Sequence, residues 1–164
     1  MTLAELWPAL EKLPWSIAIK EGGYLFPAIE SLHVLAITLV VGTITIVDLR
    51  LLGLPNREKG VRQLTKEVLP YTWAFFVLAV ISGLLMFVSR ATVYAGAAPF
   101  QVKIGIIFLA GLNTLVFHLF QYRSVDRWDR LVQPPLAAKI AGAVSLCIWM
   151  AVIVLGRWTG FVTS

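Results

Sequence analysis

The chain has few of the residues that soluble proteins use to face water. Charged residues make up 14% of its 164 positions, against about 25% in an ordinary soluble domain. Its mean hydropathy is +0.82. It also has a single cysteine, Cys147, inside an apolar run, so an internal disulfide is impossible. The composition excludes a soluble globular domain and indicates an integral membrane protein.

Motifs for common enzymatic reactions are also absent from the sequence. It contains no nucleophile elbow, phosphate-binding loop, zinc-ligand spacing or carboxylate pair in a catalytic context. Hydrolase and transferase activities therefore have no support, and an enzymatic role would be that of a membrane oxidoreductase component. The N-terminus has Glu5 and Glu11 where a signal peptide would carry bases, so we expect no cleavable signal.

The net charge of +5 does not indicate a nucleic-acid partner. The bases lie in short loops between apolar runs, where Lys and Arg anchor membrane topology beside anionic lipid. No basic face or recognition motif is present. We therefore predict a lipid bilayer, and no nucleic acid, as the environment of this chain.

Four apolar runs predict an all-α membrane bundle. We expect spans at about 28–52, 71–89, 100–122 and 136–158, each near the length that crosses a hydrocarbon core of about 30 Å. Short connections predict an up-down-up-down four-helix bundle forming one transmembrane domain over 1–164. Residues 1–22 contain tryptophans and interrupting prolines, which predict an interfacial amphipathic helix.

The distribution of bases predicts the orientation. Nine Lys and Arg residues lie in or beside the first and third loops, and five lie at the opposite ends of the spans. The positive-inside rule then places the first and third loops in the cytoplasm. We expect a multi-pass protein of the bacterial inner membrane with both termini in the periplasm.

Each span has one face of small or polar residues. These faces are predicted to point into the bundle; close packing of membrane helices alone would also explain them. The four sets are Glu30, His33, Thr38, Thr45 and Asp48; Ala79, Ser82, Met86 and Ser89; Lys103, Asn113, Thr114, His118 and Gln121; and Gly142, Ser145, Trp149 and Gly156.

The two histidines are the main candidates for a cofactor site, because ionisable residues inside spans are costly. His33 and His118 differ in expected depth by about eleven residues, or roughly 16 Å. One haem iron cannot take both within a monomer unless a helix is shifted or broken, so we predict two separate sites. Met86 comes out near the depth of His33, and the pair would suit haem b or copper. The alternative is that Met86 only fills a packing gap.

The role of His118 stays open at this point. It is a candidate five-coordinate ligand, a partner of Asp48, or a hydrogen-bonded core histidine. A symmetric homodimer would also bring two copies of one histidine to the same depth.

Two charge groups frame the predicted bundle. Glu30, Lys103 and Arg157 lie toward the outer end, where they form an ion pair or hold a carboxylate, a haem propionate or a lipid phosphate. Asp48, Arg50 and Arg123 lie toward the inner end. Snorkelling toward the headgroups is the structural alternative for both groups.

Asp48 is the charged residue with the strongest case for a specific role. It lies on the inward face of its span, where an acid needs a partner. By depth, the nearest candidates are Arg123, Lys139 and His118.

Several motifs resemble a known group of proteins. They are ESLHVLAITLVVGTITIVDLRLLG, SGLLMF, GLNTLVFHLF and GRW. Together they resemble small, functionally uncharacterised four-helix inner-membrane proteins of bacteria, over nearly the whole chain. The residues that carry the resemblance are His33, Asp48, Leu49, Arg50, Gly53, Asn113, His118, Arg157 and Trp158.

That resemblance implies no established activity. More loosely, the architecture is similar to four-helix b-type cytochromes and to the membrane partners of periplasmic copper-binding proteins. Two histidines at different depths are a departure from the paired-histidine haem sites of such cytochromes.

Three functions follow as hypotheses. The first is a haem b protein that transfers electrons between periplasmic and membrane carriers through His33, with a second site at His118. The second is copper or other metal handling with His33 and Met86. The third is a cofactor-free accessory or scaffold subunit. Expected partners are a periplasmic redox or metal-binding protein, a quinone in a site lined by Trp149 and Tyr122, and a second copy of the chain.

Overall fold

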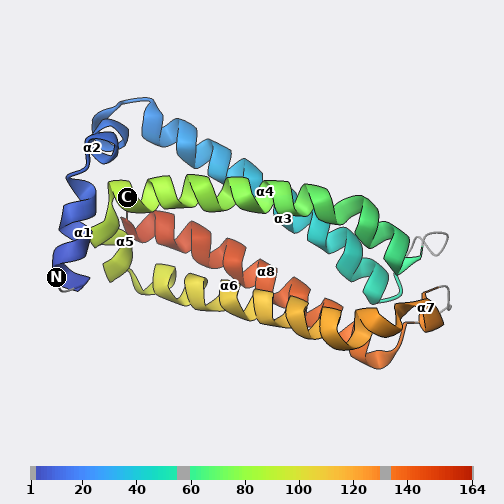
Figure 1. Ribbon diagram of the computed structural model, residues 1–164. Coiled ribbons are helices and arrows are strands. Elements are labelled where there is room, and N and C mark those ends of the chain that lie inside the picture. Colours follow the sequence, from blue (N-terminus) through green and yellow to red (C-terminus); the bar gives the residue numbers. More distant parts are fainter. Residues whose placement is uncertain (1–2, 55–59, 130–133, 164) are drawn as a thin grey trace.

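The computed structural model describes residues 3–54, 60–129 and 134–163, and it confirms the expected all-α four-helix bundle (Figure 1). Parts of the two basic loops, 55–59 and 130–133, lie outside the described residues. The long helices are α3 (Leu25–Leu51), α4 (Val61–Ser89), α6 (Ala98–Val116) and α8 (Leu136–Thr163). They run up and down in sequence order (Figure 1).

Short helices fill the ends of the bundle. These are α1 (Leu3–Glu11), α2 (Pro14–Glu21), α5 (Ala91–Gly96) and α7 (Val125–Trp128). Helix α6 continues as η1, a π-helical turn over Phe117–Gln121, and then as η2, a 3₁₀ turn over Tyr122–Ser124.

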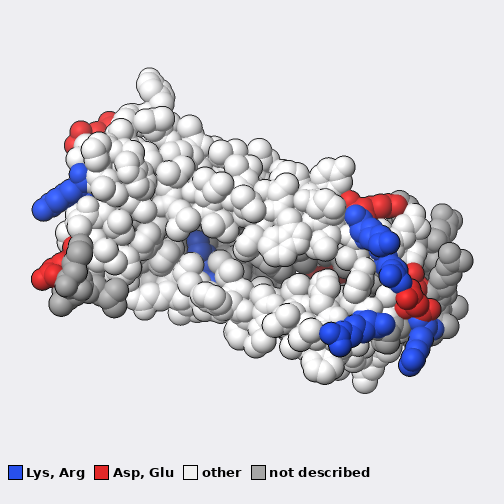
Figure 2. Space-filling model, viewed as in Figure 1, with Lys and Arg blue, Asp and Glu red and all other residues white. Residues whose placement is uncertain are grey.

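The four long helices are apolar and long enough to cross a membrane. Their lengths are 27, 29, 24 and 28 residues, with η1 counted as part of the third. At about 1.5 Å per residue, all of them exceed a hydrocarbon core of about 30 Å. Figure 2 shows most of the charged side chains at the two ends of the visible face; the surface between them is formed almost entirely by uncharged residues, with a little blue and red visible in a hollow. The chain is a multi-pass membrane protein.

The bundle is built from two helix pairs. Helix α3 packs along α4, α6 packs along α8, and the two pairs meet where α3 contacts α8. Gly142 permits this contact, because a Cβ there would lie 3.0 Å from the backbone oxygen of Asp48 and 3.1 Å from Cβ of Leu51. Within the described residues, α4 and α6 do not pack along one another. At one end, however, Phe87 of α4 stacks on Phe100 of α6, with ring centroids 5.4 Å apart.

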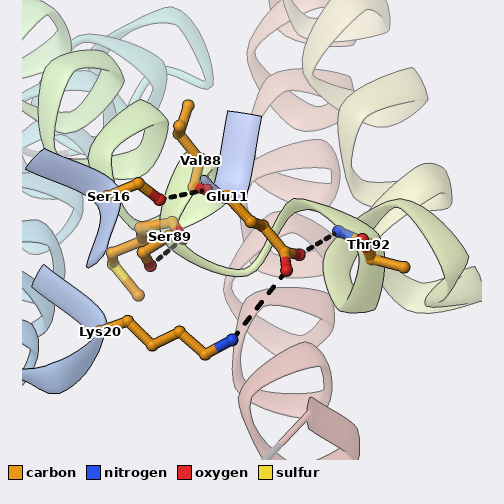
Figure 3. A network of polar contacts seen from close by, with 7 residues as sticks. Glu11, Ser16, Lys20, Val88, Ser89 and Thr92 are labelled. Atoms are coloured by element: carbon orange, nitrogen blue, oxygen red, sulfur yellow. Dashed lines mark hydrogen bonds and ion pairs between the residues drawn. The ribbon is translucent and has the colours of Figure 1, made fainter. Parts of the chain in front are cut away.

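One end of the bundle, which we call the α5 end, carries α1, α2, α5 and both termini (Figure 1). The N-terminal segment forms two helices where the sequence predicts one, because Pro14 begins a new helix. Both helices are fastened to the bundle. Ser16 Oγ donates to the Val88 carbonyl at 2.9 Å, and Glu11 accepts from the Thr92 amide at 2.7 Å and lies 4.0 Å from Lys20 (Figure 3).

The opposite end, the α7 end, has an apolar cluster under a polar cap. The cluster comprises Leu51, Val61, Phe117, Val125, Trp128 and Ala138. Above it, the carboxylate of Asp129 accepts from the backbone N–H of Arg62 at 2.9 Å and so caps the first turn of α4. Helix α4 can therefore begin at Val61, ten residues before the start of the predicted span at 71. The helix continues through Pro70.

Candidate functional site

His33 lies on the face of α3 that packs against α4. The ring meets α4 at Gly83, where a Cβ would stand 2.9 Å from Cε1 of His33. Only glycine leaves room for the imidazole in this position. The half-buried ring is thus held between the two helices of one pair.

A hydrogen bond fixes the ring and its tautomer. Nδ1 of His33 lies 3.0 Å from Oγ of Ser82, which is 1% exposed. The hydroxyl of Ser82 donates its own proton to the Leu78 carbonyl at 2.7 Å. Since a hydroxyl has a single proton, Ser82 must accept from His33, and the proton of the neutral imidazole is on Nδ1. The lone pair is then on Nε2. The Ala79 backbone also forms a hydrogen bond with the ring, one turn before Gly83.

Lys103 lies close enough to His33 for the two side chains to interact electrostatically. It comes from α6, in the other helix pair, and its Cδ would lie 3.9 Å from a Cβ built at Gly156. Its ammonium group stands 5.5 Å from the centre of the Phe100 ring. No carboxylate among the described residues forms an ion pair with Lys103. A base without an acid inside a span needs an explanation.

Three other residues are expected from the sequence at the same end of the bundle as His33. Met86 is half-buried on α4, one turn beyond Ser82, whereas the His33 ring is directed to Ser82 and Gly83. Glu30 and Arg157 are exposed, in contrast to the half-buried Lys103.

Sequence reasoning placed Ser82 on the inward face but missed its role, and it missed Gly83 entirely. The signal was available in the Ser-Gly pair of SGLLMF, where a hydrogen-bonding residue stands beside the one residue without a side chain. Arg90 was missed as well. Its guanidinium lies 5.1 Å from the centre of the Phe26 ring and donates to the Thr163 carbonyl at 3.2 Å.

His118 lies on the π-helical turn at the α7 end. Its Nδ1 is 2.9 Å from the Thr114 carbonyl, which can only accept, so Nδ1 carries the proton here too. Tyr122 lies beside the ring, with centroids 5.1 Å apart. Isolated π-helical turns are frequent at functional sites. Nearby, Asn113 ties this helix to α8 by donating to the Ala141 carbonyl at 3.1 Å.

Asp48 is 5% exposed and has Ser145 of α8 as its hydrogen-bond partner. None of the three partners expected by depth takes this position. Arg123 is exposed, Lys139 is half-buried on α8, and His118 is bonded to its own helix. Arg50 does not reach toward the headgroups, because it is 3% exposed and donates to the Asp129 carbonyl at 3.1 Å.

The described residues contain no group of three or more His, Cys, Asp or Glu side chains that would hold a metal ion. Any metal bound at His33 or His118 would therefore need ligands of another kind, such as a porphyrin or a thioether.

Comparison with known proteins gives no assignment. No protein-family model matches the chain, and no significant match was found among curated proteins or solved structures.

Proposed function

We propose that this protein is a membrane-embedded electron-transfer protein that binds haem b through Nε2 of His33. The observation that carries the proposal is the hydrogen bond from His33 Nδ1 to Ser82, which leaves the lone pair on Nε2. Histidines that bind metals generally donate their other ring N–H to a fixed acceptor in this way. The arrangement orients the ring, and Nε2 would be the nitrogen that binds.

The residues around His33 fit a haem in their donor chemistry. When bound, haem supplies one-electron redox chemistry through its iron. Ser82 orients the imidazole, and Gly83 lets it lie against α4. Lys103 has no carboxylate partner of its own among the described residues, and a haem propionate would satisfy its charge.

The proposed cellular role follows from topology. Both termini lie at the same end of the bundle (Figure 1), and the excess of bases in the opposite loops supports a periplasmic location for that end. We place the protein in a bacterial inner membrane. Electrons would pass between a periplasmic redox protein and a membrane carrier such as a quinone.

The test is an absorption spectrum of protein purified in detergent from haem-sufficient cells. We expect a Soret band that is lost in His33→Gln and retained in the matched variant His118→Gln. Ser82→Ala should weaken haem binding by about 10- to 100-fold, because it removes the group that orients the ligand. A protein without a Soret band, or a band that survives His33→Gln, would refute the proposal.

Copper handling is the second candidate, and the position of Met86 favours it. Met86 lies one turn beyond Ser82 on α4 and is half-buried, and imidazole with thioether is a suitable copper ligand set. Metal analysis after copper loading distinguishes the two: bound copper that is lost in Met86→Leu, without a Soret band, would favour copper. If the protein binds neither haem nor copper, the remaining hypothesis is a cofactor-free accessory or scaffold subunit.

A further inference from the structure

Asp48 presents a chemical problem in the interior of the bundle. It is 5% exposed, and its Oδ2 has no hydrogen-bond partner among the described residues. Its other contact is with Ser145 of α8, itself 8% exposed. A buried carboxylate with an unsatisfied oxygen and no paired cation is costly. Something must therefore neutralise it.

A second unsatisfied group lies at nearly the same level. Thr65 of α4 is 5% exposed, and its Oγ1 also lacks a partner among the described residues. The pairs His33–Ser82 and Thr43–Thr72 fix the antiparallel register of α3 and α4. Continued along the helices, this register places Thr65 opposite Arg50, about 3 Å along the axis from Asp48.

Most charged groups around Asp48 have another hydrogen-bond partner or are exposed, and Lys139 lies farther along α8. On α3, Arg50 donates to the Asp129 carbonyl. On α4, Lys66 is exposed, and Glu67 accepts from Gln63 at 2.9 Å on the exposed surface. On α8, Lys139 is half-buried and lies six residues before Ser145. From η1, which packs on α8, His118 is bonded to the Thr114 carbonyl.

We propose that Asp48 and Ser145 form a proton-binding site inside the membrane, with Thr65 on the route to it from the α7 end. A proton moves from a hydronium ion to Oδ2 of Asp48, an O–H bond forms, one water remains, and no electrons are transferred. The carboxyl is then neutral and can donate through its own O–H. The site does not depend on haem at His33, so the two proposals are tested independently.

The test is infrared spectroscopy of the full chain in lipid nanodiscs. Subtracting the Asp48→Asn spectrum from that of the native chain should give the C=O band of a neutral carboxylic acid. The band should move on exchange into D₂O and disappear reversibly as the pH is raised. The matched variant Glu30→Gln, which changes an exposed carboxyl on the same helix, should keep it.

Ser145→Ala provides a second measurement if Asp48→Asn does not fold. It removes a hydrogen bond to the carboxyl, so the band should stay and shift in frequency. Aspartate labelled with ¹³C in the native chain should shift the same band. The proposal is overturned if no such band exists at any pH at which the protein is folded. It is also overturned if the band survives Asp48→Asn, or if sodium or potassium ions remove it at constant pH, which would indicate a cation site.

Discussion

Replacing Gly142 by alanine puts a methyl group where α3 and α8 cross. The added carbon would lie 3.0 Å from the Asp48 backbone oxygen and 3.1 Å from Cβ of Leu51, closer than the roughly 3.5–4.0 Å of a good contact between carbons. One neighbour is backbone, so the helices must separate. Overpacking of this kind costs about 1–3 kcal/mol, against a gain of about 0.5–1 kcal/mol from removing a helical glycine. Taking the middle of each range, we expect a net loss of about 1 kcal/mol.

Thermal unfolding followed by tryptophan fluorescence measures this effect. For a chain of this size, about 1 kcal/mol corresponds to roughly 2–4 °C in Tm. Gly42→Ala is the matched control, since Gly42 lies inside α3 and a Cβ there meets nothing within 4 Å. It should leave Tm unchanged or raise it. Equal shifts for the two variants would show that the close approach at Gly142 does not determine how the helix pairs join.

Two further outcomes concern the ends of the bundle. Asp129→Ala should destabilise by about 0.5–2 kcal/mol, because it removes the cap from the first turn of α4. Asp126→Ala, which removes an exposed ion pair with Arg62, should cost less in the same unfolding assay. At the α5 end, burial raises the pKa of Tyr94, which lies outside the spans and bonds to Thr163. The folded state therefore holds the phenolic proton more tightly, so the contribution of Tyr94 to stability should be constant below about pH 10 and fall above it. Tyr94→Phe should reduce that alkaline fall in a pH series.

The long-range pattern of the fold could be predicted from sequence because it depends on hydropathy and periodicity. The four apolar runs specified the spanning helices, and a polar stripe predicted that His33 and Asp48 face the interior. Helix ends were less predictable. The start of α4 depends on Asp129, which lies 67 residues away in sequence and caps Arg62 only after the chain has folded.

Partner choice within the site could not be predicted from depth alone. Depth counting placed Met86 beside His33 and basic residues beside Asp48. In the structure, His33 is hydrogen-bonded to the hydroxyl of Ser82 and Asp48 to that of Ser145. Rotation about each helix axis decides between such candidates, and small side chains decide how closely two helices approach. Both depend on packing across the whole bundle, which a single helix does not encode.

The two proposed sites lie on one helix, and their separation limits how strongly they interact. His33 and Asp48 are 15 residues apart on α3, or about 22 Å along the axis. At an effective dielectric constant of about 20, unit charges at that distance interact by about 0.8 kcal/mol, which is about 30 mV for a one-electron couple. A rigid bundle therefore allows only a small effect of proton binding at Asp48 on a haem at His33. A larger effect would require α3 and α8 to move against each other at Gly142, because that crossing joins the two helix pairs and contains Asp48.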